Sequence, residues 1–178
     1  MEFLNKIFAM LLKWVPRIIL IAPDERGIRV TLGTQVKILK PGWYFYWGVI
    51  QELRSATVTQ QVIDLRPQSV FTRSGRNWTV SGIIKYRVTD IRKAMLSVQD
   101  YDKSLQALSL GILLNILSTV ENIEKQTPNE IGDLVLKSVR EAANGWGIKI
   151  QQVFISDLGQ VRNIRLLTDR VVGDVTDG

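Results

Sequence analysis

Hydrophobic and polar positions are segregated in the first seventeen residues, MEFLNKIFAMLLKWVPR. On a helix of about 100° per residue, one arc holds the charged, polar and small side chains and the other holds all the large apolar ones. A basic face opposite a face of Trp, Phe and Leu is typical of a helix that lies in the plane of a membrane interface. We expect membrane contact from Phe3, Leu4, Lys6, Ile7, Phe8, Leu11, Lys13, Trp14 and Arg17.

The same segment is a poor candidate for a span across the bilayer. A spanning helix needs about 20 predominantly apolar residues, whereas Lys6, Lys13 and Arg17 interrupt this one. A shallow insertion continuing through residues 18–21 stays open, and so does an ordinary helix packed on a soluble core. We predict an anchor helix over residues 1–21 that lies in the interface.

Beyond residue 21 the pattern changes to short strands separated by turn residues. Ile28, Val30 and Leu32 alternate with polar residues, and residues 33–35 predict a hairpin loop that returns through Val36. Residues 40–42, Lys-Pro-Gly, predict the next turn. The pattern of this part of the chain therefore predicts a small antiparallel or mixed sheet.

The clearest strand covers residues 78–88, where the even-numbered positions are apolar or glycine and the odd-numbered ones are mostly polar. Such a period of two indicates a strand that is buried on one face. We predict that it pairs with residues 62–71 through the turn at residues 73–76.

After residue 90 the apolar spacing becomes helical. Apolar residues recur at i, i+3 and i+4 between Leu105 and Val120, and a second helix begins with residues 127–130, Thr-Pro-Asn-Glu, a capping box with proline in the first helical position. A final strand is predicted over residues 148–155. Strands followed by helices and one more strand indicate an α+β fold of two lobes.

These patterns divide the chain into three parts. Residues 1–21 form the anchor, residues 22–158 form the two-lobed domain, and residues 159–178 form a short helical or extended tail. The tail has apolar residues at roughly helical spacing, but a sustained coiled coil needs at least three to four heptads.

Composition excludes most familiar catalytic devices. The 178 residues include no Cys and no His, which excludes thiol nucleophiles, disulfides, zinc sites of the Cys/His type and imidazole bases. The sequence also has no nucleophile elbow and no phosphate-binding glycine loop. We expect no enzymatic activity, no cofactor and no metal.

The net charge of +6 is unevenly distributed: residues 1–90 hold 13 Lys and Arg against six Asp and Glu. Positive charge therefore shares its half of the chain with the predicted anchor, which favours attraction to an anionic bilayer. A nucleic acid is the rival partner for a basic chain, but its binding needs cations gathered on one helix face or groove. Here they are spread along strands, so we expect no nucleic-acid partner.

Several short stretches carry a resemblance to a known family, in matching order over about residues 22–158. They are PDERG at 23–27, Leu32-Gly33, PGWYF at 41–45, residues 80–88 before Asp90, VQDY at 98–101, Leu105, WGI at 146–148 and ISDL at 155–158. The chain thereby resembles the SPFH or Band 7 proteins, which include stomatin, prohibitin, flotillin and the HflK/HflC pair.

The resemblance implies a membrane-bound oligomeric scaffold without catalysis of its own, in which side-by-side domains form rings or cages that organise lipid or enclose membrane proteases. It also implies the two-lobed α+β fold. Members usually carry a membrane hairpin or span at the N-terminus and continue into a long coiled coil. We expect a short member without that coiled coil, attached to an inner, cytoplasmic or equivalent membrane.

Residues 43–47 are five aromatics in a row, WYFYW. A strand buried on one side places only alternate residues in the core, so the others must meet lipid, a neighbouring subunit or a second buried layer. Trp and Tyr are favoured at bilayer interfaces. Against plain core packing, we predict a second membrane contact at Trp43, Tyr44, Phe45 and Trp47.

Opposite charges on the two halves suggest contacts between copies. Cations lie on or beside the clearest strand and acids lie in the later half, so they are candidates for a head-to-tail contact; a solvated polar face is the alternative. The predicted oligomer contacts are Arg73, Arg76, Lys85, Arg87, Asp100, Asp102, Glu121 and Glu124.

The sequence thus favours a membrane-attached oligomeric scaffold that organises lipid and membrane proteins. The alternative is a regulatory module that binds a membrane protease or a larger partner of the same family and does not build rings.

Overall fold

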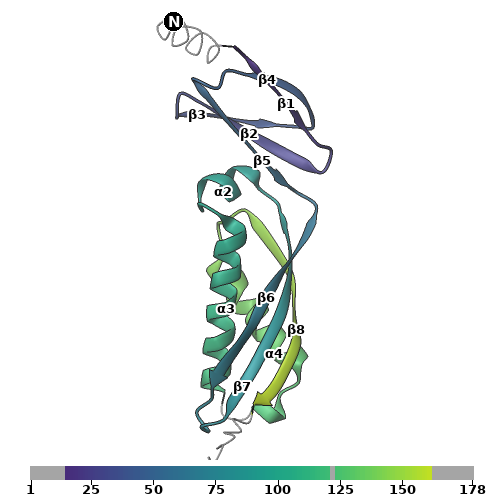
Figure 1. Ribbon diagram of the computed structural model, residues 1–178, viewed down its shortest axis with the longest axis vertical. Helices are drawn as coiled ribbons and strands as arrows, with labels where there is room; N and C mark the ends of the chain where they lie inside the picture. The colour runs from purple at the N-terminus through teal and green to yellow at the C-terminus, as the bar shows by residue number, and fades with distance from the viewer. Residues whose placement is uncertain (1–14, 121–122, 162–178) are drawn as a thin grey trace, which may run out of the picture.

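The computed structural model describes residues 15–120 and 123–161. Residues 1–14 of the helix predicted over residues 1–21 lie outside the described residues. The elements in chain order are β1 (Arg17–Ile21), β2 (Glu25–Thr31), β3 (Gln35–Leu39), β4 (Gly42–Tyr46), β5 (Gln51–Thr57), β6 (Gln60–Phe71), β7 (Asn77–Val88), α2 (Ile91–Leu96), α3 (Tyr101–Thr119), η1 (Ile123–Lys125), α4 (Pro128–Ala142) and β8 (Ile148–Val161). The molecule is elongated, with the five short strands β1–β5 at one end and the three long strands β6–β8 with helices at the other (Figure 1).

The N-terminal lobe contains two small antiparallel sheets. One has the order β3-β2-β5, and the other pairs β1 with β4. The predicted hairpin is confirmed, since β2 and β3 pair from Thr31 opposite Gln35 to Gly27 opposite Leu39. The lobe therefore matches the small antiparallel sheet expected from the short alternating segments.

The prediction that the anchor helix extends to residue 21 is wrong, because residues 17–21 form strand β1. Three of these five residues are isoleucine, whose branched side chain fits a pleated surface better than a helix. Their partner is β4, with Leu20 opposite Trp43. That pairing joins residues more than twenty positions apart, so a local helical pattern could not reveal it.

The second lobe is built on the antiparallel sheet β6-β7-β8. Strand β7 alternates as predicted, with Trp78, Val80, Ile84 and Tyr86 buried and the residues between them more exposed. Strand β6 pairs with it, and a register shift lies between Leu65 and Gln68. The shift accommodates Pro67, which cannot donate to a ladder and is tolerated at bulges and sheet edges.

Helices α3 and α4 supply the apolar side chains that cover one face of this sheet. Leu105 and Leu113 of α3 and Ile131 and Val135 of α4 are fully buried with the sheet residues. Helix α4 begins with the predicted capping box, in which Thr127 and Glu130 each accept a backbone N–H. Strand β8 runs on to Val161, so it extends into the region predicted as a tail.

The short helix α2 lies where the two lobes meet (Figure 1). Its buried Ile91 and Ala94 pack with Ile28 of β2 and Val88 of β7. The carbonyl oxygen of Gly147 accepts the backbone N–H groups of Thr89 and Asp90, each at 2.9 Å. The α+β prediction is confirmed, with an apolar cluster joining the lobes.

Candidate functional site

The two sheets of the N-terminal lobe approach each other closely on one side of β1. Ile21 is 1% exposed, and a Cβ on Gly27 of β2 would lie 2.6 Å from its Cδ1 atom. The absence of a side chain at Gly27 therefore lets β1 lie directly on β2. Ile19 of β1 and Tyr44 and Tyr46 of β4 are half-buried, in alternation with exposed neighbours.

The opposite side of the β1-β4 pair is open and entirely apolar. Ile18 lies opposite Phe45 and Leu20 opposite Trp43, and these side chains are 59%, 65%, 54% and 70% exposed, in that order. Directly opposed residues on one face of an antiparallel pair lie about 5 Å apart. We call these four residues the apolar platform. A contiguous exposed apolar face of this kind marks a contact with a membrane or another protein.

Two neighbouring loops present more exposed apolar side chains. In the turn after β4, the N–H groups of Ile50 and Gln51 both bond the carbonyl oxygen of Trp47, at 3.1 and 2.8 Å. Leu32, at the end of the β2-β3 hairpin, donates its N–H to the carbonyl oxygen of Ile50 at 2.9 Å. The exposed residues of the two loops, which we call the apolar tip, are Leu32, Trp47, Val49 and Ile50.

Leu32 is in a strained conformation for its residue type. Its φ is 49°, the hairpin turn continues with Gly33 at φ 71°, and the leucine side chain is 71% exposed. A left-handed conformation costs an L-residue other than glycine roughly 1–2 kcal/mol. Because this leucine side chain is exposed, no burial in the core offsets the cost of its backbone conformation. Contact with another surface is the simplest explanation for a leucine at this position. The sequence pattern placed Leu32 in a strand and did not predict its exposed, left-handed position. The Leu-Gly pair before Thr34 was the only signal for a turn there.

Arg17 places a cation beside the turn of the apolar tip, on the face of the β1-β4 pair opposite the platform. It starts β1 opposite Tyr46, and a Cβ on Gly48 would lie 3.6 Å from its Nε atom. The guanidinium therefore lies next to the turn that carries Trp47 and Val49. The other predicted contacts near the N-terminus, from Phe3 to Trp14, lie outside the described residues.

The aromatic run divides between two faces. Trp43, Phe45 and Trp47 are exposed as the membrane hypothesis requires, whereas Tyr44 is half-buried on the side that faces β2 and β5. Alternation along β4 separates them, because successive side chains of a strand point to opposite faces. The membrane contact predicted for Tyr44 stays a prediction, at a half-buried position.

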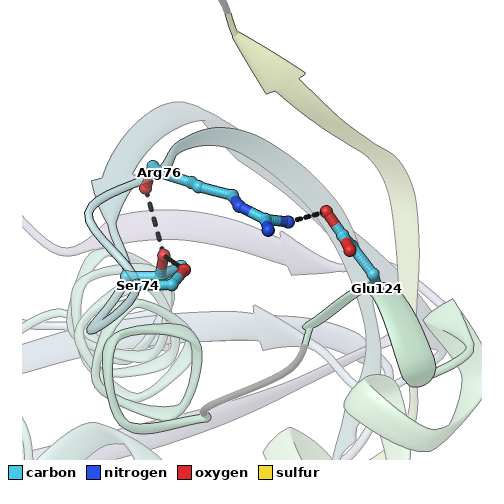
Figure 2. A network of polar contacts seen from close by, with 4 residues as sticks. Ser74, Arg76 and Glu124 are labelled. Atoms are coloured by element: carbon cyan, nitrogen blue, oxygen red, sulfur yellow. Dashed lines mark hydrogen bonds and ion pairs between the residues drawn. The ribbon is translucent and has the colours of Figure 1, made fainter.

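Several predicted oligomer contacts have partners within the chain. Figure 2 shows Arg76, after the β6-β7 turn, in an ion pair with Glu124 of η1. Both side chains are about half exposed. Arg73 lies exposed in the same turn, and Lys85 and Arg87 point away from the core on β7. Glu121 lies outside the described residues.

The two predicted aspartates serve helix α3. Asp100 accepts the backbone N–H of Lys103 at 3.1 Å and pairs with its ammonium at 3.1 Å. The backbone N–H, followed by the ammonium, lowers the pKa of Asp100. Asp102 accepts the hydrogen bond of the Tyr86 hydroxyl, whose oxygen also lies 2.6 Å from Oε1 of Gln61. A role for these residues between copies stays a prediction.

The buried Tyr86 hydroxyl is held in its protonated form. Burial, followed by the hydrogen bond to Asp102, raises the pKa of Tyr86. Burial also raises the pKa of Tyr101, with Asp102 and Asp100 adding to the effect. The two rings meet edge to face, with centroids 6.4 Å apart. This network ties α3 to β6 and β7.

Within residues 15–120 and 123–161, no helix combines the length and the apolar character that a membrane span requires. No group of three or more acidic side chains there could hold a metal ion.

The amino-acid sequence is similar to a family model and to several known proteins. Residues 19–165 match the model of the SPFH domain / Band 7 family. An uncharacterised protein of Methanocaldococcus jannaschii is 26% identical over 85% of this chain and 76% of its own length. A putative band 7 family protein of Acanthamoeba polyphaga mimivirus is 26% identical over 78% of the chain, and mouse stomatin is 27% identical over 66% of it. The chain covers less than half the length of these last two, 46% and 42%.

Proposed function

The chain belongs to the SPFH domain / Band 7 family, and on that premise we propose that it is a membrane-associated, non-enzymatic scaffold protein. In this proposal the apolar platform and the apolar tip rest in the interfacial layer of the bilayer. The observation that carries it is the open face of β1 and β4, where four large apolar side chains are each more than half exposed.

The energetics favour attachment in more than one place. Burying one large apolar side chain contributes roughly 1.5–3 kcal/mol, so four half-immersed platform residues would contribute on the order of 5 kcal/mol. This is close to the membrane affinity of a single myristoyl chain, which binds only reversibly. The amphipathic segment predicted over the first seventeen residues supplies the second attachment, and its Arg17 adds an attraction to anionic lipid of about 1 kcal/mol.

The position of the platform within the molecule also fits a peripheral attachment. The β1-β4 pair lies at one end of the elongated molecule, and the helical lobe lies at the other end (Figure 1). A protein anchored in this way holds its second lobe off the membrane. We propose that this lobe mediates assembly into rings or cages that organise lipid and membrane proteins.

Vesicle flotation tests the membrane contact. We expect Trp43→Ser combined with Phe45→Ser to lower partitioning of the full chain onto phosphatidylcholine–phosphatidylserine vesicles by roughly tenfold or more. The matched control is Phe71→Ser with Phe154→Ser, two exposed aromatics of the other lobe. Equal partitioning of the two variants would refute the platform as a membrane contact.

Light scattering of the full chain in mild detergent tests the assembly. A large, discrete homo-oligomer supports the scaffold. Monomers that form a one-to-one complex with a membrane protease or a larger family member support the alternative, a regulatory module.

A further inference from the structure

A groove lies between the edge strand β6 and helix α3, on the lobe that carries no part of the platform. Its volume is about 470 Å³, within the range of roughly 300–1,000 Å³ that is typical of ligand sites. The residues that line this α3-β6 groove are Arg66, Gln68, Lys103, Gln106, Ala107 and Leu110.

The chemistry of the lining is cationic and amide-rich. Arg66 forms no ion pair with any residue in the described ranges. Lys103 pairs with Asp100 at its rim, but its side chain is 85% exposed, and exposed ion pairs are weak enough to exchange partners. Gln68 and Gln106 offer both donors and acceptors, and Ala107 and Leu110 add apolar surface to the lining. We propose that this groove binds an acidic, extended segment of a partner protein.

Strand addition is a poor alternative at this edge. The side chain of Gln106 already donates to the backbone carbonyl of Asp64 at 2.8 Å. Pro67 has no N–H to offer, and it lies where the register of β6 shifts. A bound segment would therefore be recognised through its side chains, and two cations select carboxylates.

A lipid headgroup is a less suitable occupant. Strand β6 and helix α3 belong to the helical lobe, away from β1 and β4 (Figure 1). A chain that rests on the bilayer through the platform would hold the α3-β6 groove toward the aqueous side, where it can meet a protein. The choice of a protein over a lipid rests on the proposed membrane contact, whereas the cationic lining of the groove does not depend on it.

Fluorescence anisotropy tests the groove with the full chain in mild detergent and, as probe, a labelled decapeptide of alternating Glu and Gly. We expect saturable binding at low salt that weakens as salt rises. The variant Arg66→Glu with Lys103→Glu should lose at least about tenfold in affinity, because attraction becomes repulsion. Arg66→Gln with Lys103→Gln, folded by circular dichroism, should lose affinity in the same direction.

The matched control is Lys137→Glu with Lys149→Glu, which changes the net charge equally at exposed sites outside the groove. It should bind the probe within about twofold of the unaltered chain, since distant exposed charges are screened. Absence of saturable binding, or equal loss in the two double variants, overturns the proposal, because the second result would mean general attraction to a basic chain. Vesicle flotation measures membrane attachment separately, so the two proposals can fail independently.

Discussion

Gly132 of α4 lies directly against the backbone of Val153 in β8: a Cβ on Gly132 would stand 2.8 Å from the carbonyl oxygen of Val153. Both residues are buried. The missing side chain lets the helix approach the strand closely enough for Ile131 and Val135 to reach the core.

Replacing Gly132 by alanine should destabilise the protein. Glycine to alanine inside a helix normally stabilises by about 1 kcal/mol, but the added methyl meets a backbone atom that cannot turn aside, and overpacking costs roughly 1–3 kcal/mol. We expect a net loss of about 1–2 kcal/mol in the free energy of unfolding, measured with urea. Gly111→Ala in α3 is the control, because its Cβ would meet open space, and it should stabilise. Shifts in the same direction for both variants would contradict the close contact.

Tyr86→Phe should destabilise the second lobe at neutral pH. The substitution removes the hydroxyl that donates to Asp102 and contacts Gln61, and loss of a hydrogen bond to a carboxylate costs about 1–3 kcal/mol. Denaturant unfolding at pH 7 measures the change. Tyr44→Phe, on the N-terminal lobe, is the control and should have a smaller effect.

The same tyrosine should make stability fall in alkali. The pKa of Tyr86 is raised in the folded chain, whereas an unfolded tyrosine ionises near pH 10. Below about pH 10 both states keep the proton, and above it only the unfolded state loses it, so the free energy of unfolding falls by up to about 1.4 kcal/mol per pH unit for this group. Tyr86→Phe should show a shallower decline in a series of urea titrations from pH 9 upward. An identical slope would contradict the assignment.

The ion pair of Arg76 and Glu124 should contribute little to stability. It links the β6-β7 turn to η1 across 48 positions of sequence, but both side chains are about half exposed. Exposed pairs contribute about 0.2–1 kcal/mol. A double-mutant cycle with Arg76→Gln and Glu124→Gln should give a coupling energy in this range that declines in high salt. A larger coupling, insensitive to salt, would mean that the pair is buried in an assembly.

Leu32→Asn should stabilise the folded protein and weaken its binding to membranes. Asparagine tolerates the left-handed conformation better than leucine, so unfolding should become less favourable by up to about 1 kcal/mol. The exposed apolar side chain is lost at the same time, so vesicle partitioning should weaken. Thermal unfolding and vesicle flotation together provide the check. Unchanged partitioning would remove Leu32 from the apolar tip.

Local patterns predicted the elements whose structure depends on near neighbours. The alternation of β7, the β2-β3 hairpin and the capping box of Thr127 and Glu130 all involve residues within one strand, one turn or one helical turn. Their signals lie in consecutive residues, and the structure reproduces them. Alternation along β4 likewise explains why Trp43 and Phe45 are exposed while Tyr44 is not.

Pairing between distant strands decided the structure of segments whose local sequence pattern suited more than one element. Residues 17–21 carry an apolar pattern that suits a helix or a strand, and pairing with β4 selects the strand. The same pairing creates the apolar platform, since Ile18 and Phe45 face each other only in that register. The α3-β6 groove and the ion pair of Arg76 with Glu124 likewise join residues at least 35 positions apart. The sequence by itself determined the local elements and the apolar, basic character of the N-terminal half, because these depend on composition and short-range spacing. Only the tertiary structure decided which exposed side chains lie side by side, because that depends on contacts between distant segments.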